Sequence, residues 1–129
     1  MLHSNPELHE EILDWTRKEL GEILKNSQQA IYIYVCDRHK TCNEMFSSML
    51  GCGSPEEWSE SEDALSDVIE EDQHILVSAY KNAVEKAIGS SIQIRWKNRK
   101  TSNLIKTNVI LVPLSYKGEL FALHFITKI

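Results

Sequence analysis

Apolar residues recur along the chain with two different periods, and the change between them predicts the order of the elements. From Pro6 to about Lys25 they recur at helical spacing, and Asn5 suits the N-cap of this helix. A second long helix is predicted from about Glu71 to Ala87. From Ser91 the period becomes two, which predicts three consecutive strands joined by polar turns. This order is typical of an α+β fold.

The segment between the two long helices predicts a strand, a turn, a short strand and a capped helix. Both alternating faces of residues 30–37 are apolar or aromatic, as in a strand covered on two sides. Asn43 suits the N-cap of the short helix, and Gly51 suits the left-handed position that ends it. Ser54 and Pro55 suit the start of another short helix.

The first helix carries two apolar stripes, whereas docking on a single sheet usually uses one. One stripe comprises Leu8, Ile12, Trp15 and Ile23, and the other comprises Leu13, Leu20 and Leu24. We therefore expect residues 1–26 to form an amphipathic helix that precedes a domain of residues 27–129. We also expect Leu13, Leu20 and Leu24 to form the interface of a homodimer. The alternative is a helix folded wholly onto its own sheet.

Composition and charge narrow the function. The chain of 129 residues is long enough for one domain with its own core. Its net charge of −5 argues against non-specific binding to nucleic acid. No apolar run approaches the roughly 18 residues of a membrane span, and residues 1–25, with six carboxylates, do not resemble a signal peptide. We therefore expect a cytoplasmic protein.

Residues with potential chemistry are scattered along the sequence. Cys36, Cys42 and Cys52 form no C-x-x-C pair, so neither a disulfide framework nor a four-ligand zinc site is expected. No hydrolase, metalloprotease or phosphate-loop motif is present, so we expect no catalytic residue, no metal and no enzymatic activity.

Charges are segregated between two segments of the chain. Residues 56–72 hold nine carboxylates and no Lys or Arg, without the spacing of a calcium loop, which favours a solvated acidic face. Residues 87–117 hold no Asp or Glu, so the predicted hairpin there is basic. This hairpin either pairs with the acidic segment or is solvated.

Several of these residues resemble a PAS domain, the small sensory module of signalling proteins. Family members often show an apolar strand closed by Asp, then Asn, Phe and Gly in one short helix, here Asp37, Asn43, Phe46 and Gly51. Residues 54–58 resemble the "PEEL" segment after that Gly, and residues 68–72 resemble the entry to the longest internal helix, with Glu70 in place of the usual Pro. Residues 125–127 are similar to a frequent terminal Asp-Ile-Thr, without its Asp. The resemblance covers roughly residues 27–128.

The resemblance implies an antiparallel five-stranded sheet with helices on one face and a pocket between them. The residues that would line this pocket are Phe46, Trp58, Leu76, Tyr80 and Trp96. Haem-binding relatives use a histidine on the long internal helix, but His74 lies beside acidic residues in an exposed first turn. Flavin photosensors need an Asn-Cys-Arg segment, which is absent here. We therefore expect a colourless protein without a cofactor.

The function implied by the resemblance is a sensory and dimerisation module of a protein such as a sensor histidine kinase. It would bind a small molecule and pass the change through a terminal helix to an output domain, in the same chain or a separate one. The alternative is a constitutive protein–protein adaptor whose core is filled by its own side chains. A third interpretation, a small-molecule enzyme on a similar scaffold, has no motif behind it.

Overall fold

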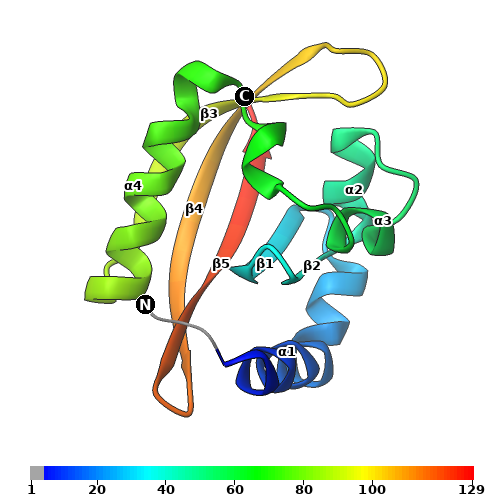
Figure 1. Ribbon diagram of the computed structural model, residues 1–129. Helices are drawn as coiled ribbons and strands as arrows, with labels where there is room; N and C mark the ends of the chain where they lie inside the picture. The colour runs from blue at the N-terminus through cyan, green and yellow to red at the C-terminus, as the bar shows by residue number, and fades with distance from the viewer. Residues whose placement is uncertain (1–4) are drawn as a thin grey trace.

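The computed structural model describes residues 5–129, which form one antiparallel sheet with helices on both faces (Figure 1). The helices are α1 (Pro6–Asn26), α2 (Glu44–Leu50), α3 (Pro55–Ser59) and α4 (Glu70–Lys86), with a 3-10 helix, η1, at Ala64–Asp67. The strands are β1 (Ala30–Cys36), β2 (His39–Cys42), β3 (Ser90–Lys97), β4 (Leu104–Tyr116) and β5 (Glu119–Lys128). The predicted α+β class, five-stranded antiparallel sheet and N-terminal helix are confirmed. None of the helices described is long and apolar enough to cross a membrane.

The last strand of the chain lies at the centre of the sheet. The strands are ordered β2-β1-β5-β4-β3, so β5 pairs with both β1 and β4. The turn between β4 and β5 places Lys117 at φ 50° and Gly118 at φ 82°, as a tight hairpin turn requires. In the β1–β5 register, Tyr32 lies opposite His124. This register brings together two side chains of the cavity described below.

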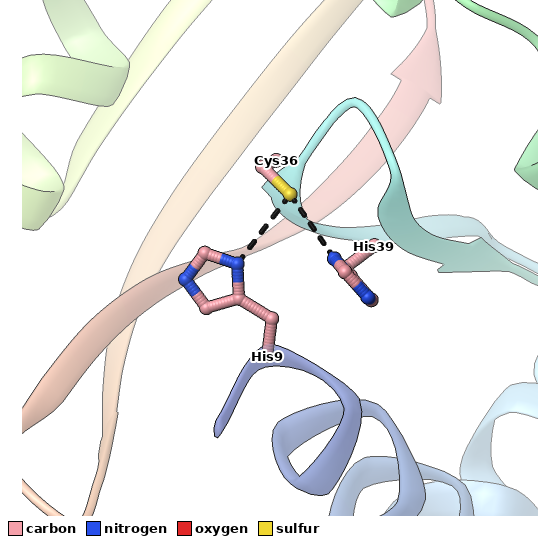
Figure 2. A group of neighbouring side chains, drawn as sticks. All are labelled: His9, Cys36 and His39. Atoms are coloured by element: carbon pink, nitrogen blue, oxygen red, sulfur yellow. Dashed lines mark hydrogen bonds between the residues drawn. The ribbon is translucent and has the colours of Figure 1, made fainter. Parts of the chain in front are cut away.

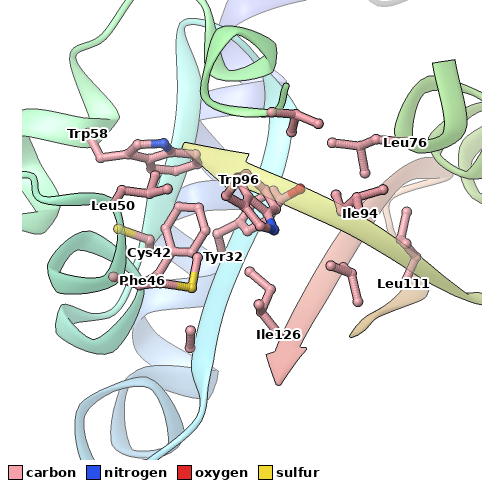
Figure 3. Close-up of a cluster of buried hydrophobic side chains, with 14 of the residues drawn as sticks. Tyr32, Cys42, Phe46, Leu50, Trp58, Leu76, Ile94, Trp96, Leu111 and Ile126 are labelled. Atoms are coloured by element: carbon pink, nitrogen blue, oxygen red, sulfur yellow. The ribbon is translucent and has the colours of Figure 1, made fainter. Parts of the chain in front are cut away.

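The inner face of the sheet is covered by α2, α3 and α4, which together enclose the larger core (Figures 1 and 3). Its centre is aromatic: the Phe46 ring lies 4.7 Å from that of Tyr32, 5.1 Å from that of Trp58 and 5.5 Å from that of Trp96. Aliphatic residues of α4, β3, β4 and β5 complete the core, among them Leu76, Ile94, Leu111 and Ile126. The predicted placement of helices on one face therefore holds for α2, α3 and α4.

The outer face of the sheet is covered in part by α1. Ile12 and Leu13 are buried there against Ile33 and Val35 of β1 and Phe121 of β5. This contact explains why both faces of β1 are apolar, because each face meets a different layer of helices.

The two apolar stripes of α1 are not separate surfaces. Leu13, which was predicted at a dimer interface, is only 3% exposed because it packs against the sheet. Leu24 is partly buried at the edge of the same cluster, and Leu20 is half-buried. Ile23 is the most exposed large apolar residue of the helix, at 55%. The N-terminal half of α1 thus behaves as the alternative predicted, folded onto its own sheet.

The predicted caps form in the structure. Asn5 and Ser54 accept hydrogen bonds from the backbone N–H groups of Leu8 and Glu57, and they begin α1 and α3. Gly51 ends α2 at φ 78°, and a Cβ there would come within 2.7 Å of Asn98 Oδ1. A larger residue is therefore disfavoured both by the positive φ and by this contact.

The acidic segment and the basic hairpin are held together by two ion pairs. Asp67 accepts from Arg99 Nε and Nη2 at 2.8 and 2.9 Å, and Asp72 accepts from the backbone and guanidinium of Arg95 at 2.8–2.9 Å. These hydrogen bonds lower the pKa of Asp72. Of the two possibilities left open by the sequence, pairing is therefore the one observed, and it fixes α4 against β3 and η1 against the turn that follows β3.

Candidate functional site

A cavity of about 380 Å³ lies between α4 and the inner face of the sheet. Strands β1, β3 and β5 contribute its floor, α4 forms one wall, and α3 and η1 form another. Most of the lining is apolar, including Leu65, Leu76, Val77, Val84 and Leu120. Ligand pockets of proteins are typically about 300–1,000 Å³ and mostly apolar, so the cavity has the size and character of a small-molecule site.

Four of the five residues predicted to line a pocket face this cavity. Trp58, Leu76, Tyr80 and Trp96 belong to its lining. Phe46 does not, because it is completely buried behind Trp58 and Trp96 (Figure 3). That the lining residues bind a ligand stays a prediction.

Two buried polar atoms of lining residues have no hydrogen-bond partner within residues 5–129, and neither is exposed to the open space of the cavity. They are Nε1 of Trp58 and Nδ1 of His124, and both side chains are only 1% exposed. Leaving a buried polar atom unpaired costs about 1–3 kcal/mol, so such atoms are uncommon in folded proteins. Tyr32 contacts both rings, with centroids 5.4 Å from Trp58 and 3.9 Å from His124. Two rings beside the cavity thus carry unpaired polar atoms, which a ligand would reach only after the rings turn toward it.

His124 is neutral in this environment. Burial lowers its pKa to about 3, although backbone groups of Tyr32 and Ala122 act in the opposite direction. A neutral imidazole carries one N–H and one lone pair, so Nδ1 donates or accepts according to the tautomer. His124 lies in the interior, and its Nδ1 has no hydrogen-bond partner among the described residues.

Acidification is expected to destabilise the protein through His124. The unfolded residue binds a proton below about pH 6.5, whereas the folded residue stays neutral to about pH 3. The unfolded state therefore gains protons first, and stability present above pH 6.5 is lost as the pH falls. Between pH 7 and 5 the loss from this group is about 2 kcal/mol. Between these pH values, His124→Phe should lose less of its free energy of unfolding than the unaltered chain, by this amount, as measured with urea. An equal loss in both proteins would contradict a neutral, buried His124.

The rim of the cavity is held by hydrogen bonds between α4, β1 and η1. The Tyr80 hydroxyl donates to the Val35 carbonyl at 3.1 Å, which joins α4 to β1. Asp37, just after β1, accepts from the N–H of Ala64 in η1 at 3.1 Å. Tyr34 packs edge-on against Tyr80 with ring centroids 5.2 Å apart. Burial raises the pKa of both tyrosines, so their hydroxyls stay neutral.

Sequence patterns did not identify the wall that η1 contributes. Ala64 and Leu65 lie within the acidic segment, whose charge predicted a solvated face. Their signal was weak, since an apolar pair between carboxylates does not show helical or strand periodicity over so short a run. Tyr34 packs against Tyr80 and also lines the cavity.

A second cluster of reactive side chains lies outside the cavity, where α1 meets the turn between β1 and β2 (Figure 2). Cys36 Sγ lies 3.5 Å from Nδ1 of His9 and 3.3 Å from Nδ1 of His39. Burial lowers the pKa of His39, which favours its neutral, metal-binding form. These three residues are donors of the kind that bind transition metals. Their spacing along the chain gave no such signal, because His9 lies in a different segment from Cys36 and His39.

Comparisons with known proteins agree with the fold. No family model and no curated protein matches the sequence. Among solved structures, the PAS domain of a protein from Colwellia psychrerythraea matches 87% of this chain and 95% of its own, at a TM-score of 0.71 and 17% identity. The PAS domain of an HTR-like protein from Haloarcula marismortui matches 95% of this chain and 99% of its own, at a TM-score of 0.65 and 19% identity.

A third solved structure is a PAS domain from a two-component sensor histidine kinase. It matches 90% of this chain and 98% of its own, at a TM-score of 0.66 and 13% identity. At these identities the likeness is one of fold. The chain has the PAS fold.

Proposed function

We propose that this protein is a sensory module that binds a small molecule in the cavity between α4 and the sheet. The observation that carries the proposal is the apolar cavity of about 380 Å³, whose lining includes two residues with an unpaired buried polar atom, Trp58 and His124. The expected ligand is compact and mostly apolar. A hydrogen-bond acceptor on it would pair with the Trp58 N–H, and a second polar group with His124 Nδ1, once these buried rings turn toward the cavity. The PAS domain of a two-component sensor histidine kinase among the similar structures adds support.

Strand β1 provides a route from the cavity to α1. Tyr32 and Tyr34 line the cavity on one face of the strand, while Ile33 on the other face packs against Ile12 and Leu13 of α1. A ligand that favours one position of β1 would therefore change how α1 packs on the sheet. It shifts the equilibrium between two positions of α1 only by the difference in its affinity for the two. The change would be passed to an output domain, in the same chain or in a partner.

The exposed part of α1 is proposed to form a homodimer. Its C-terminal half presents Ile23, flanked by the half-buried Leu20 and Leu24. Removing α1 would not test this cleanly, because the deletion would also expose Ile33 and Phe121.

Point substitutions provide the test of the dimer. At roughly 100 µM the unaltered chain should scatter light as a dimer, and Ile23→Glu with Leu20→Glu should be monomeric. Ser78→Glu, an exposed position on α4, is the control that should remain dimeric. A monomer at this concentration for the unaltered chain would refute the proposal.

No catalytic constellation is proposed, and the module is expected to act in the cytoplasm, where free thiols such as Cys42 and Cys52 stay reduced. The constitutive adaptor remains the second candidate. It is favoured by the close packing of Phe46, Trp58 and Trp96, which already fill the interior beside the cavity.

Ligand screening separates the two candidates. Small apolar compounds with one or two polar groups should raise the melting temperature by about 5–10 °C at a hundredfold excess over Kd. Native mass spectrometry of the purified chain should show any molecule it retains. Val77→Phe, which adds a ring at the cavity wall, should abolish the shift, whereas Val112→Phe on the other face should not. A constitutive adaptor would show no retained mass and no thermal shift with any compound.

A further inference from the structure

Three metal-ligand atoms converge where α1 meets the β1–β2 turn. They are Nδ1 of His9, Sγ of Cys36 and Nδ1 of His39, and all lie within 4.8 Å of one another (Figure 2). His9 is buried at 2% exposure, while Cys36 and His39 are half-buried, so a solvated ion can reach the cluster.

The separations match those between ligands of a tetrahedral zinc ion. Zinc binds thiolate sulfur at about 2.3 Å and imidazole nitrogen at about 2.0–2.1 Å, and the tetrahedral angle then places S and N about 3.5 Å apart. The observed Sγ to Nδ1 separations are 3.5 Å to His9 and 3.3 Å to His39. An ion could therefore enter with small side-chain adjustments.

Both histidines also have the carboxylate partner that is usual for metal-bound imidazoles. Nε2 of His9 lies 3.6 Å from Glu119, and Nε2 of His39 lies 3.4 Å from Glu10. A carboxylate at Nε2 holds the proton on that nitrogen and turns the Nδ1 lone pair toward the metal. Two independent carboxylates, one from β5 and one from α1, thus lie on the Nε2 side of two rings whose Nδ1 atoms face one sulfur.

A metal ion would also suit the proton count at the cluster. The Cys36 thiol has one proton, so it can donate to only one of the two Nδ1 atoms that face it. A cation accepts the lone pairs of all three atoms at once, with the thiol proton released to solvent.

We propose that His9, Cys36 and His39 form a site for a divalent transition metal, with Zn²⁺ as the occupant that fits the donors best. Imidazole and thiolate select Zn²⁺ over Mg²⁺ or Ca²⁺, which prefer oxygen. Three protein donors leave a fourth position for water.

The site joins three segments: α1, the end of β1 and the start of β2. Binding therefore clamps the N-terminal half of α1 to the sheet without occupying the cavity. Glu119 contacts His9 and also lines the cavity, so the two sites share one residue.

Metal titration of the full chain tests the proposal. The chain is reduced, stripped with a chelator and titrated with Co²⁺ and Zn²⁺. We expect one metal per chain, a thiolate-to-Co²⁺ charge-transfer absorption, and slower amide exchange in residues 8–16 once Zn²⁺ is bound. Glu10→Gln and Glu119→Gln should each weaken Zn²⁺ binding by about 10–100-fold.

Ligand variants with matched controls locate the metal. Cys36→Ser should abolish the charge-transfer absorption, and His39→Gln should weaken binding more than either carboxylate variant does. Cys52→Ser and His74→Gln alter a thiol and a histidine elsewhere and should bind Zn²⁺ as the unaltered chain does. His39 is half-buried in the turn between β1 and β2, and circular dichroism of its variant checks that the fold is kept. No Zn²⁺ binding at roughly 1 mM, or equal binding by the Cys36→Ser/His39→Gln double variant, would overturn the proposal.

Discussion

Replacing Phe46 by alanine is expected to lower the free energy of unfolding by about 3–5 kcal/mol. The ring is completely buried and contacts Tyr32, Trp58 and Trp96. Its removal loses the apolar transfer energy and leaves a void, since three large rings on strands and helices cannot collapse into the gap. Urea unfolding with circular dichroism and tryptophan fluorescence measures the loss.

The same variant links the core to the cavity. Apolar voids of this kind stay dry and accept small aromatic molecules, so saturating indole should restore part of the lost stability in Phe46→Ala. Phe46→Leu, which leaves a smaller void, should lose less and respond less. A loss below about 1 kcal/mol for the alanine variant would mean that the aromatic cluster is not packed as described.

Replacing Asn43 by alanine should cost about 2–4 kcal/mol. Its Oδ1 accepts from the N–H groups of Phe46 and Ile31 at 3.0 and 3.1 Å, and its Nδ2 donates to the Gln29 carbonyl at 2.8 Å. Alanine removes the N-cap of α2, worth about 1 kcal/mol. It also leaves the Ile31 N–H and the Gln29 carbonyl unpaired, and a buried group left in that way costs about 1–3 kcal/mol. Chemical unfolding again measures the change.

Ser54→Ala provides the matched control for Asn43→Ala. Ser54 caps α3 at an exposed position through one hydrogen bond to Glu57 N, so its loss should cost only about 1 kcal/mol. Equal losses at the two caps would show that the contacts of Asn43 to β1 contribute nothing.

Local signals in the sequence predicted most of the fold. The capping residues Asn5, Asn43 and Ser54 each carry their own short-range signal, and all three cap the helices they were predicted to begin. The period-two pattern after Ser91 likewise reports strands whose two faces have different surroundings. Such signals depend only on neighbours within a few residues.

The site was less predictable because it depends on contacts between distant segments. The unpaired state of His124 Nδ1 follows from its place opposite Tyr32 on β1, far away in sequence. The cluster of His9, Cys36 and His39 requires α1 to pack on the sheet through Leu13, a residue whose stripe suggested a partner chain instead. Helical periodicity shows which face of a helix is apolar, but not what covers it.

The most direct test of ligand binding in the cavity is the nuclear magnetic resonance signal of the Trp58 indole N–H during a ligand titration. The three tryptophans give three such signals. The indole N–H of Trp96 already donates a hydrogen bond to Thr107 Oγ1 at 2.8 Å. Trp15 lies on the outer face of the sheet beside Tyr116. A compound that binds in the cavity should move the Trp58 signal downfield as its N–H gains an acceptor, while the Trp15 signal stays in place. Compounds that stabilise the protein yet leave the Trp58 signal unmoved would contradict binding in the cavity.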